Sequence, residues 1–500
     1  MSFLIFTSFI ISTVSFIGYV IISRLEYHKL RNKLGLTGPE THWFLGNMHQ
    51  IAERKSAIGY DDTFEWLREL HEKYGDKYGL YFGNQFSIQL SNEEDIKEVF
   101  IKNFSNFSDR LLAPLSSEGK LMTSLLNVSH VNGWKNTRSA ISPIFTTSKM
   151  KAMHDTVSGK IDTFLEILEE KMGKGEKWDI YEDFQALTLD VIGNCAFAID
   201  SNCQRNRSEM FYVQARNFVK NMDIKESWVY SLSYILPEVT WFWKLLYRFT
   251  GMAAAEIPLV DGLSCVYERR RAGEGSASID LLKLLLDREN HKDHPMSKQE
   301  VVENCFAFLL AGYETTSTAL TYCTYLLSKH PDVQKRLVEE ILEVKSWQGL
   351  NYDSIHNMKY LDAVYKETLR VYPPVMHFIN RVCLQDTVIR GQLIPKGTCI
   401  SVNPYTVHRN EQNWPNASEF QPERFLDFED KHSLKWIPFG VGPHICVGMR
   451  FAEMEFKTTV VKLLEKFHVA DSGDVMVPEG NGIIMKPRNG VKVGLRLRND

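Results

Sequence analysis

The chain has 500 residues, 44% of them hydrophobic and 12% aromatic, so it can bury a large core and does not resemble an intrinsically disordered protein. Its 58 Lys and Arg residues nearly balance 62 Asp and Glu residues, and a formal net charge of −4 argues against a nucleic-acid-binding protein. The eight scattered cysteines include no C-x-x-C pair, which suits a reducing compartment and argues against a zinc site.

The N-terminus begins with an apolar segment, since residues 2–23 contain no charged side chain. About 20 apolar residues in a helix cover the roughly 30 Å core of a bilayer, so residues 1–23 are expected to form a transmembrane signal-anchor helix. Four basic residues between 24 and 33 follow this segment and none precedes it, which predicts that the body lies in the cytosol. A cleaved signal peptide is the alternative, but its basic n-region and A-x-A site are missing.

The rest of the chain is predicted to be mainly α with a minor β component. Residues 24–39 are expected to form a basic linker and hinge, and residues 40–500 a single domain, because no long Pro- or Gly-rich linker and no internal repeat divides them. Spacings of three and four between apolar residues predict helices, and short alternating patterns predict strands. The predicted helices are Lys160–Met172, Ser278–Arg288, Ser297–Lys329, Pro331–Val344 and Tyr360–Val371, and the predicted strand regions are Tyr78–Leu90 and Asp386–Val402.

Two residues early in the body, Trp134 and Arg138, stand four positions apart. A helix would place them on one face. Many helices contain such a W-x-x-x-R pair, so it carries little weight alone.

The long predicted helix contains the sequence Ala311-Gly312-Tyr313-Glu314-Thr315-Thr316. The small residues would leave a groove along the helix, and the Thr315 hydroxyl can donate to the carbonyl of Ala311 four residues earlier. A hydroxyl and a carboxylate at such a groove can relay protons to a reacting group. The alternative is a glycine-containing kink whose polar residues face another helix.

Glu367 and Arg370 stand three apart on the next predicted helix, and Pro422-Glu423-Arg424-Phe425 follows later. An i, i+3 pair can form an ion pair, although single pairs of this kind are common on solvated helices.

The most informative stretch is F-G-V-G-P-H-I-C-V-G at residues 439–448. Its closely spaced glycines and proline predict a rigid turn whose backbone can lie against a flat ligand. Cys446 stands just before a long amphipathic pattern, and the positive end of a helix dipole favours a thiolate. Amides of the turn can also donate to the sulfur. The alternative is an inert cysteine in a turn before a helix.

Together these motifs, in this order, resemble the cytochrome P450 family from about residue 38 to the C-terminus. F-G-x-G-P-x-x-C-x-G is similar to its haem-binding signature, A-G-x-E-T-T to its oxygen-activation motif, and E-x-x-R with P-E-R-F to its structural elements. The resemblance implies the cytochrome P450 fold, an α-helical haem domain with small β-sheets. It also implies haem b, iron protoporphyrin IX, with Cys446 as the axial thiolate.

The resemblance assigns roles to further residues. Phe107–Arg110 and Asn380–Cys383 resemble family segments whose arginines reach the haem propionates. Many members carry Arg two residues before the cysteine, whereas this chain has His444, which can donate the same hydrogen bond with a charge that depends on pH. The implied residues are Arg110, Trp134, Arg138, Ala311, Gly312, Arg381, Phe439, Gly440, His444 and Gly448 for cofactor binding, Glu314 and Thr315 for proton relay, and Glu367, Arg370 and Arg424 for a buried charge network beside the haem.

The implied activity is monooxygenation, the insertion of one atom of O₂ into a hydrophobic small molecule. The sequence contains no G-x-G-x-x-G for a nucleotide and no second domain for a flavin, so electrons are expected from NADPH–cytochrome P450 reductase, with cytochrome b5 as a second candidate donor. The implied location is the endoplasmic reticulum membrane, with the catalytic domain on its cytosolic face. A basic docking surface is expected around Lys135, Lys435 and Arg450.

Two other functions stay open. One is a P450-type isomerase or dehydratase that acts on a peroxide without a reductase, and the other is a non-enzymatic haem-thiolate sensor or haem carrier. Ser142–Thr146, the A-G-Y-E-T-T motif and Arg381–Cys383 lean toward the drug- and steroid-oxidising branch. The sequence does not identify the substrate. Residues lining its site are expected within 111–129, 211–235, 305–311 and 375–378.

Overall fold

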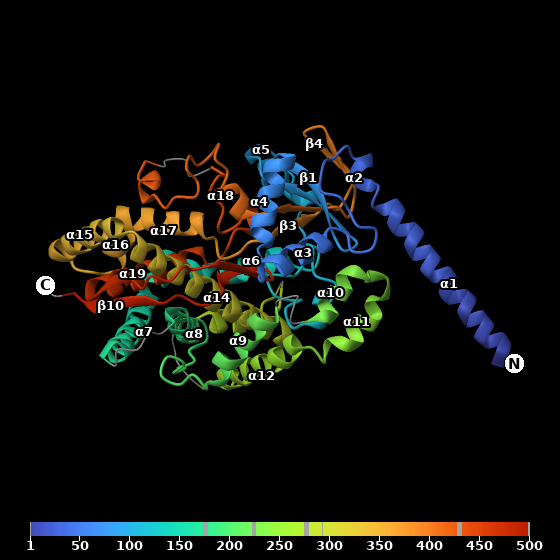
Figure 1. The fold of residues 1–500 in the computed structure, drawn as a ribbon. Coiled ribbons are helices and arrows are strands. Elements are labelled where there is room, and N and C mark those ends of the chain that lie inside the picture. The colour runs from blue at the N-terminus through green and yellow to red at the C-terminus, as the bar shows by residue number, and fades with distance from the viewer. Residues whose placement is uncertain are drawn as a thin grey trace.

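The computed structural model describes residues 2–498 apart from 174–178, 223–226, 275–279, 293 and 428–432, and it shows a mainly α-helical body with small sheets (Figure 1). The predicted fold class is therefore confirmed. The α-helices among the described residues are α1 (Ser2–Tyr27), α2 (Leu30–Lys33), α3 (Met48–Ile58), α4 (Thr63–Tyr74), α5 (Glu93–Lys97), α6 (Trp134–Ile141), α7 (Thr147–Gly173), α8 (Ile180–Phe197), α9 (Met210–Asn221), α10 (Trp228–Ile235), α11 (Thr240–Tyr247), α12 (Gly251–Arg271), α13 (Leu281–Leu286), α14 (Lys298–Lys329), α15 (Pro331–Gln348), α16 (Tyr352–His356), α17 (Lys359–Val371), α18 (Pro404–His408) and α19 (Met449–Lys466). The strands are β1 (Lys77–Phe82), β2 (Gln85–Leu90), β3 (Ile379–Val382), β4 (Thr387–Ile389), β5 (Gln392–Ile394), β6 (Cys399–Val402), β7 (Phe467–Asp471), β8 (Pro478–Asn481), β9 (Ile484–Pro487) and β10 (Val493–Leu497).

Helix α14 runs through the middle of the body and contacts α8, α12, α17 and α19 (Figure 1). Ser297 caps its N-terminus, because the Ser297 hydroxyl accepts a hydrogen bond from the Glu300 amide while the Glu300 carboxylate accepts one from Ser297 N at 2.7 Å. Pro331 opens the next helix at a position where its missing N–H leaves no intrahelical bond unmade. Helix α14, predicted at Ser297–Lys329, spans Lys298–Lys329, and α15, predicted at Pro331–Val344, extends to Gln348.

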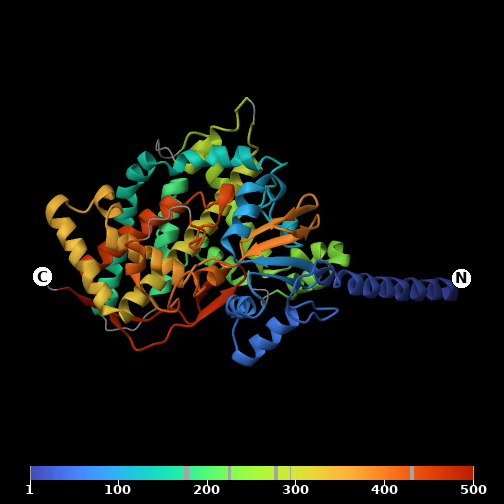
Figure 2. The same ribbon diagram turned by 90° about the horizontal axis from the view of Figure 1, so that it is seen from above.

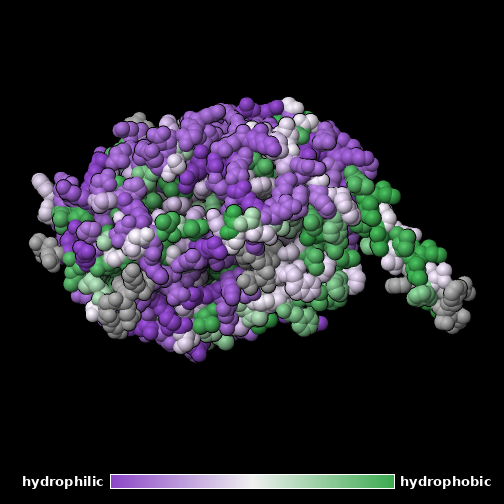
Figure 3. Space-filling view, viewed as in Figure 1, coloured by the Kyte–Doolittle hydropathy of each residue, from purple (hydrophilic) through white to green (hydrophobic). Residues whose placement is uncertain are grey.

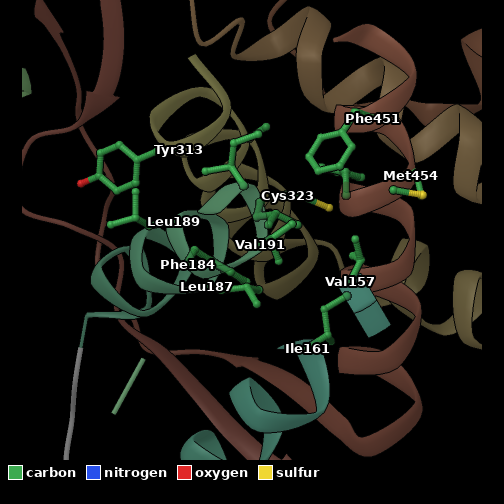
Figure 4. Packing of buried hydrophobic residues seen from close by; sticks show 14 of the residues in the cluster. Val157, Ile161, Phe184, Leu187, Leu189, Val191, Tyr313, Cys323, Phe451 and Met454 are labelled. Atoms are coloured by element: carbon green, nitrogen blue, oxygen red, sulfur yellow. The ribbon is translucent and has the colours of Figure 1, made fainter. Parts of the chain in front are cut away.

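The hydrophobic core surrounds α8, which is buried along nearly its whole length. Figure 4 shows Leu187 and Val191 of α8 beside Val157 and Ile161 of α7, with Met454 of α19 nearby. A helix that is buried on every side, with Asp183, Gln185 and Asp190 among its buried residues, carries no simple amphipathic pattern, which is why the sequence did not predict this one.

The four-stranded sheet has the order β1-β2-β6-β3, with β2 and β6 parallel and the other neighbours antiparallel. It lies on the side of the body where α1 leaves (Figure 2). A bridge between Asp109 and Val382 lays the segment before Arg110 along β3, with Val382 N donating to Asp109 O at 2.9 Å. This pairing brings Arg110 and Arg381, which are far apart in the sequence, to the same end of the sheet.

Most predicted elements are found, with shifted ends. The predicted helix at 160–172 is the C-terminal half of α7, and that at 360–371 is α17. The first two residues of the predicted segment 278–288 lie outside the described residues, and α13 covers 281–286. The two predicted strand regions are the β1–β2 hairpin and β4 to β6.

The N-terminal helix differs from the expected anchor in length. Helix α1 projects from the body, is long and apolar enough to cross a membrane, and continues to Tyr27 instead of ending at residue 23 (Figures 1 and 2). Arg24 is only 1% exposed and pairs with Glu238 at 2.7 Å, so it packs on the body. Gly38, in the predicted hinge, lies so close to β1 that a Cβ atom would meet Gly79 O at 2.3 Å. The segment 24–39 is therefore bound to the sheet side of the body in this structure.

A buried carboxyl group in α19 gives a prediction about stability. Glu455 is fully buried, neither of its oxygens accepts a hydrogen bond from a described group, and burial raises its pKa well above the usual 4.5. Above about pH 4.5 this residue ionises in the unfolded chain, which stabilises the unfolded state, while the folded protein keeps it protonated. The free energy of unfolding should therefore fall as pH rises, until the folded carboxyl itself ionises.

Denaturant unfolding across pH 4 to 8 tests this, with Glu455→Gln and Glu455→Leu compared with the native chain. Both variants should lack this part of the pH slope, by up to about 1.4 kcal/mol per pH unit. Slopes equal to that of the native chain in both variants would show that Glu455 does not titrate in this way.

Candidate functional site

The cysteine loop is held in a narrow turn by its own backbone. Cys446 N donates to Phe439 O at 2.8 Å, and Gly440 and Gly442 have positive φ angles of 83° and 69°. At Gly442 a Cβ atom would meet Phe100 O at 2.2 Å, so this position requires glycine. The predicted rigid turn before a helix is confirmed, with α19 starting three residues after the cysteine.

The Cys446 sulfur faces an internal cavity, and the exposed surface of this residue borders that cavity. Burial raises the pKa of the thiol, whereas the backbone N–H groups of Gly448 and Met449 and the positive charge of Arg138 act in the opposite direction. The amides at the start of α19 thus point at the sulfur, as the sequence predicted for a thiolate ligand.

The cavity lies between the cysteine loop and α14, and its walls are mostly apolar. Ala311, Gly312 and Thr315 of α14 line one side. Every residue that the sequence assigned to cofactor binding lies on its wall: Arg110, Trp134, Arg138, Ala311, Gly312, Arg381, Phe439, Gly440, His444 and Gly448.

Three arginines converge on this cavity from different elements. Arg138 lies on α6, Arg381 on β3, and Arg110 on the segment bridged to β3, where it stacks on the Phe378 ring at 3.9 Å. None forms an ion pair with a carboxylate within the described part of the chain. Burial lowers the pKa of all three, that of Arg381 to about 10, and the charge of Arg381 lowers that of Arg110 further.

This arrangement fits haem b. Two propionates would supply the negative charge that the three guanidinium groups lack, and the buried Nε atoms of Arg110 and Arg381 have no protein partner among the described residues. The apolar walls suit a flat porphyrin, and the thiol of Cys446 suits iron.

The expectation that His444 donates to a propionate stays a prediction. His444 Nε2 lies 2.9 Å from Ser108 O, and the ring stacks on Trp134 with centroids 4.0 Å apart. Burial and the nearby Arg381 and Arg110 lower the pKa of His444 well below its usual range. In this structure His444 thus contacts a backbone carbonyl through Nε2 and packs on the Trp134 ring.

Of the predicted proton-relay pair, only Thr315 reaches the cavity. Its hydroxyl donates to Ala311 O at 2.7 Å, as the sequence predicted. Glu314 is fully buried on the flank of α14 that faces α8, where it accepts hydrogen bonds from Tyr181 and, at 3.0 Å, from Gln185. Burial raises its pKa. The carboxyl group is thus turned away from the cavity, and a direct relay role for Glu314 is not supported by this arrangement.

The charge network has the predicted membership. Arg370 pairs with Glu367 at 2.7 Å with both side chains fully buried, and Arg424 approaches the same carboxylate at 3.5 Å. The remaining donors of Arg370 reach backbone carbonyls of His408, Ala417 and Glu419 between 2.7 and 2.9 Å. All five N–H groups of this guanidinium are therefore used.

The network is connected to the cysteine loop through a residue that the sequence did not single out. His408 accepts from Ile437 N at 2.8 Å through Nε2, while its carbonyl accepts from Arg370. Ile437 O in turn accepts from Gly440 N at 3.1 Å. His408 had no motif around it that could have revealed this role.

The substrate-side walls come from three of the four predicted segments. Leu125 and Leu126, from the predicted segment 111–129, line the cavity, as do Ala307 and Phe308 from 305–311. The segment 375–378 contributes its first and last residues. No described residue of 211–235 lies on the wall, and 223–226 fall outside the described residues.

The comparisons with known proteins agree with this site. The family model described as Cytochrome P450 matches residues 36–493. The chain is 32% identical to cytochrome P450 3A12 of Canis lupus familiaris over 462 residues, which covers 90% of this chain and 88% of that protein. It is 30% identical to cytochrome P450 3A13 of Mus musculus over 467 residues, with the same coverage. It is 32% identical to cytochrome P450 3A6 of Oryctolagus cuniculus over 466 residues, covering 90% and 89%.

The charge network predicts a large effect of a single substitution. Arg370→Ala would leave the Glu367 carboxylate buried without its partner, which should lower the free energy of unfolding by about 3–5 kcal/mol and reduce the yield of haem-loaded protein. Arg336→Ala is the matched control, because Arg336 pairs with Glu423 at 2.8 Å with both side chains about half exposed, at 49% and 52%. Urea unfolding should give about 0–1 kcal/mol for this control. Equal losses in the two variants would contradict the role of the buried network.

Proposed function

Because this chain belongs to the cytochrome P450 family of haem-thiolate monooxygenases, we propose that it inserts one atom of O₂ into a hydrophobic small molecule, with electrons from NADPH delivered by a reductase. The observation that carries the proposal is the Cys446 sulfur at the floor of a mostly apolar cavity whose opposite wall is the small-residue groove of α14. The drug- and steroid-oxidising branch suggested by the motifs stays the proposed substrate class.

The residues of this site divide into holding and positioning groups. Cys446 would ligate the iron, with the amides of Gly448 and Met449 moderating the charge on its sulfur. Arg110, Arg138 and Arg381 would hold the propionates. When bound, the haem supplies the binding and reduction of dioxygen, which the side chains alone cannot perform.

Thr315 is the residue proposed to move a proton in this cavity. Its hydroxyl donates to Ala311 O, so its oxygen lone pairs face the cavity and can accept a donor there. A hydroxyl fixed in this way can pass on a proton by exchanging one hydrogen bond for another. Glu314 would act from a distance, by holding α14 against α8 through Tyr181 and Gln185.

The membrane side of the molecule is proposed from α1 and a neighbouring apolar surface. Trp241, Leu245 and Phe249, on and just after α11, are 66%, 54% and 75% exposed. Figure 3 shows apolar surface along α1 and on the adjacent side of the body. With α1 as the anchor in the endoplasmic reticulum membrane and the basic residues after it on the cytosolic side, this surface would rest on the bilayer.

The reductase would dock on the cysteine side. Lys135 and Arg450 are exposed there, which supports them as contacts for an acidic partner. Lys435 is less available, because it lies 3.8 Å from Glu93. Cytochrome b5 is a second candidate for the same surface.

The role of Thr315 can be tested with a matched pair of threonines. Thr315→Ala should lower the product formed per NADPH oxidised, by about 10²-fold if the hydroxyl supplies the proton, and Thr315→Ser should restore it. Thr321→Ala is the control, because Thr321 makes the same back-bond to Ser317 O at 2.7 Å but is fully buried away from the cavity. Unchanged coupling in Thr315→Ala would remove this hydroxyl from the mechanism.

The ligand and the reaction class can be tested together. The carbon monoxide difference spectrum of the reduced native chain should show the strongly red-shifted Soret band of thiolate-ligated haem, and Cys446→Ser should lack it. A band at the position of histidine-ligated haem in both would exclude Cys446. Oxygen uptake with NADPH and reductase then separates a monooxygenase from a peroxide isomerase and from a non-enzymatic sensor, neither of which consumes oxygen in this way.

A further inference from the structure

The loop of residues 118–126, which precedes α6, lies over the cavity. Its backbone is held by three buried side chains from other elements. Glu256 lies on α12, and Glu303 and Asn304 lie on α14. They are 2%, 2% and 0% exposed. We call these three residues the clasp.

Each residue of the clasp accepts one backbone amide of the loop. Lys120 N donates to Glu256 at 2.6 Å, Thr123 N to Glu303 at 2.7 Å and Leu125 N to Asn304 at 2.9 Å. The Thr123 hydroxyl adds a second bond to Glu303 at 2.8 Å. A loop rarely has three amides in six residues bound by buried side chains of other helices, since loop amides are mostly solvated.

The acceptors of the clasp are themselves held in place. Gln299 donates to the second oxygen of Glu303 at 2.8 Å, and the Asn304 amide group donates to Glu300 O at 2.7 Å. The Tyr247 hydroxyl donates to the second oxygen of Glu256 at 2.8 Å. Both carboxylates are therefore oriented toward the loop before any ligand is bound.

The loop residues that the clasp fixes are cavity wall. Leu125 and Leu126 line the cavity, and Leu125 is the residue whose amide Asn304 holds. Ala307 and Phe308, one turn further along α14 than the clasp residues, line the same cavity. One helix thus forms one wall directly and sets the position of the facing wall through two side chains.

We propose that Glu303 and Asn304, with Glu256, are positioning residues that determine which large ligands the cavity accepts, by fixing Leu125 and Leu126 over it. The proposal rests on the proposed function only in that the ligand enters this cavity above the haem. Because Glu256 also binds Tyr247 at the end of α11, the same clasp connects the cavity wall to the element proposed to face the membrane.

The test uses the full-length, haem-loaded protein and two independent measurements. Hydrogen exchange of residues 118–126 reports on the loop without any ligand. Affinities for imidazole, which is small enough to bind iron without reaching the loop, and for clotrimazole, a bulky azole, are read from the shift of the Soret band.

Glu303→Leu and Asn304→Leu should speed exchange at Thr123 and Leu125 by about ten- to a hundredfold, because each removes a buried hydrogen-bond acceptor. Affinity for clotrimazole should change by about tenfold or more, the scale of one or two apolar contacts, while that for imidazole is kept. Glu303→Gln keeps an acceptor oxygen, so the exchange rates and the clotrimazole affinity of this variant should be close to those of the native protein. Should Glu303→Leu fail to fold, Thr123→Val, which removes just the hydroxyl, should show a smaller change of the same sign.

Asp190→Leu is the matched control. Asp190 of α8 is 1% exposed and accepts hydrogen bonds from Cys203 N at 2.9 Å, Gln204 N at 3.1 Å and the Ser201 hydroxyl at 2.7 Å. These three donors belong to a loop that does not line the cavity. The control variant should lose stability without changing the ratio of the two affinities. Equal changes of that ratio in Asp190→Leu and Glu303→Leu, or native exchange and affinities in the clasp variants, would overturn the proposal. Absence of any imidazole spectrum in the native protein would instead contradict the proposed haem enzyme.

Discussion

The guanidinium of Arg370 is the interaction on which the site depends. It is fully buried, and each of its five N–H groups meets an oxygen atom of Glu367 or of the 408–419 backbone. A buried cation is strongly destabilising unless its hydrogen bonds are complete. The segments that supply the acceptors must therefore keep their positions. One of them, His408, carries the constraint onward to Ile437 and from there to the turn that presents Cys446. The position of the sulfur is therefore set by a charge pair that never touches the cavity.

Helix α14 has a different task on each of its faces. The face with Ala311 and Thr315 forms the wall opposite Cys446, and the flank with Glu314 is bonded to α8. Its first turns hold the loop that closes the cavity through Glu303 and Asn304. This division explains how a helix with a small-residue stretch at its centre can stay in place: the polar contacts on its other faces are buried and paired.

The sequence predicted those parts of the site that depend on local spacing. The turn around Gly440 and Gly442, the back-bond of Thr315 and the pairing of Glu367 with Arg370 all follow from residues within a few positions of one another, and all are found. Side-chain direction on a helix flank depends on the neighbouring helix, so the departure of Glu314 toward Tyr181 could not be predicted without knowing that α8 packs there. The same holds for His444, whose Nε2 lies 2.9 Å from a carbonyl 336 residues earlier in the chain. Conversely, α8 escaped prediction because its burial on all sides removes the polar face that reveals a helix.

The contact between Arg24 and Glu238 has a mechanical consequence. Arg24 stands in the last turns of α1, and its partner lies between α10 and α11, so the end of the helix is joined to the body by a partly buried ion pair and by a hydrogen bond to Phe44 O at 3.1 Å. A body tethered by a flexible linker would tumble over the bilayer and present every side in turn. In the proposed arrangement, with α1 in the membrane, this contact would limit how far the body can tilt relative to its anchor, and the cysteine side would keep a nearly constant angle to the plane of the lipid. The proposed electron-donating partner, if confined to the same plane, would then have to search in two dimensions and one rotation, which would raise the fraction of its encounters that are productive.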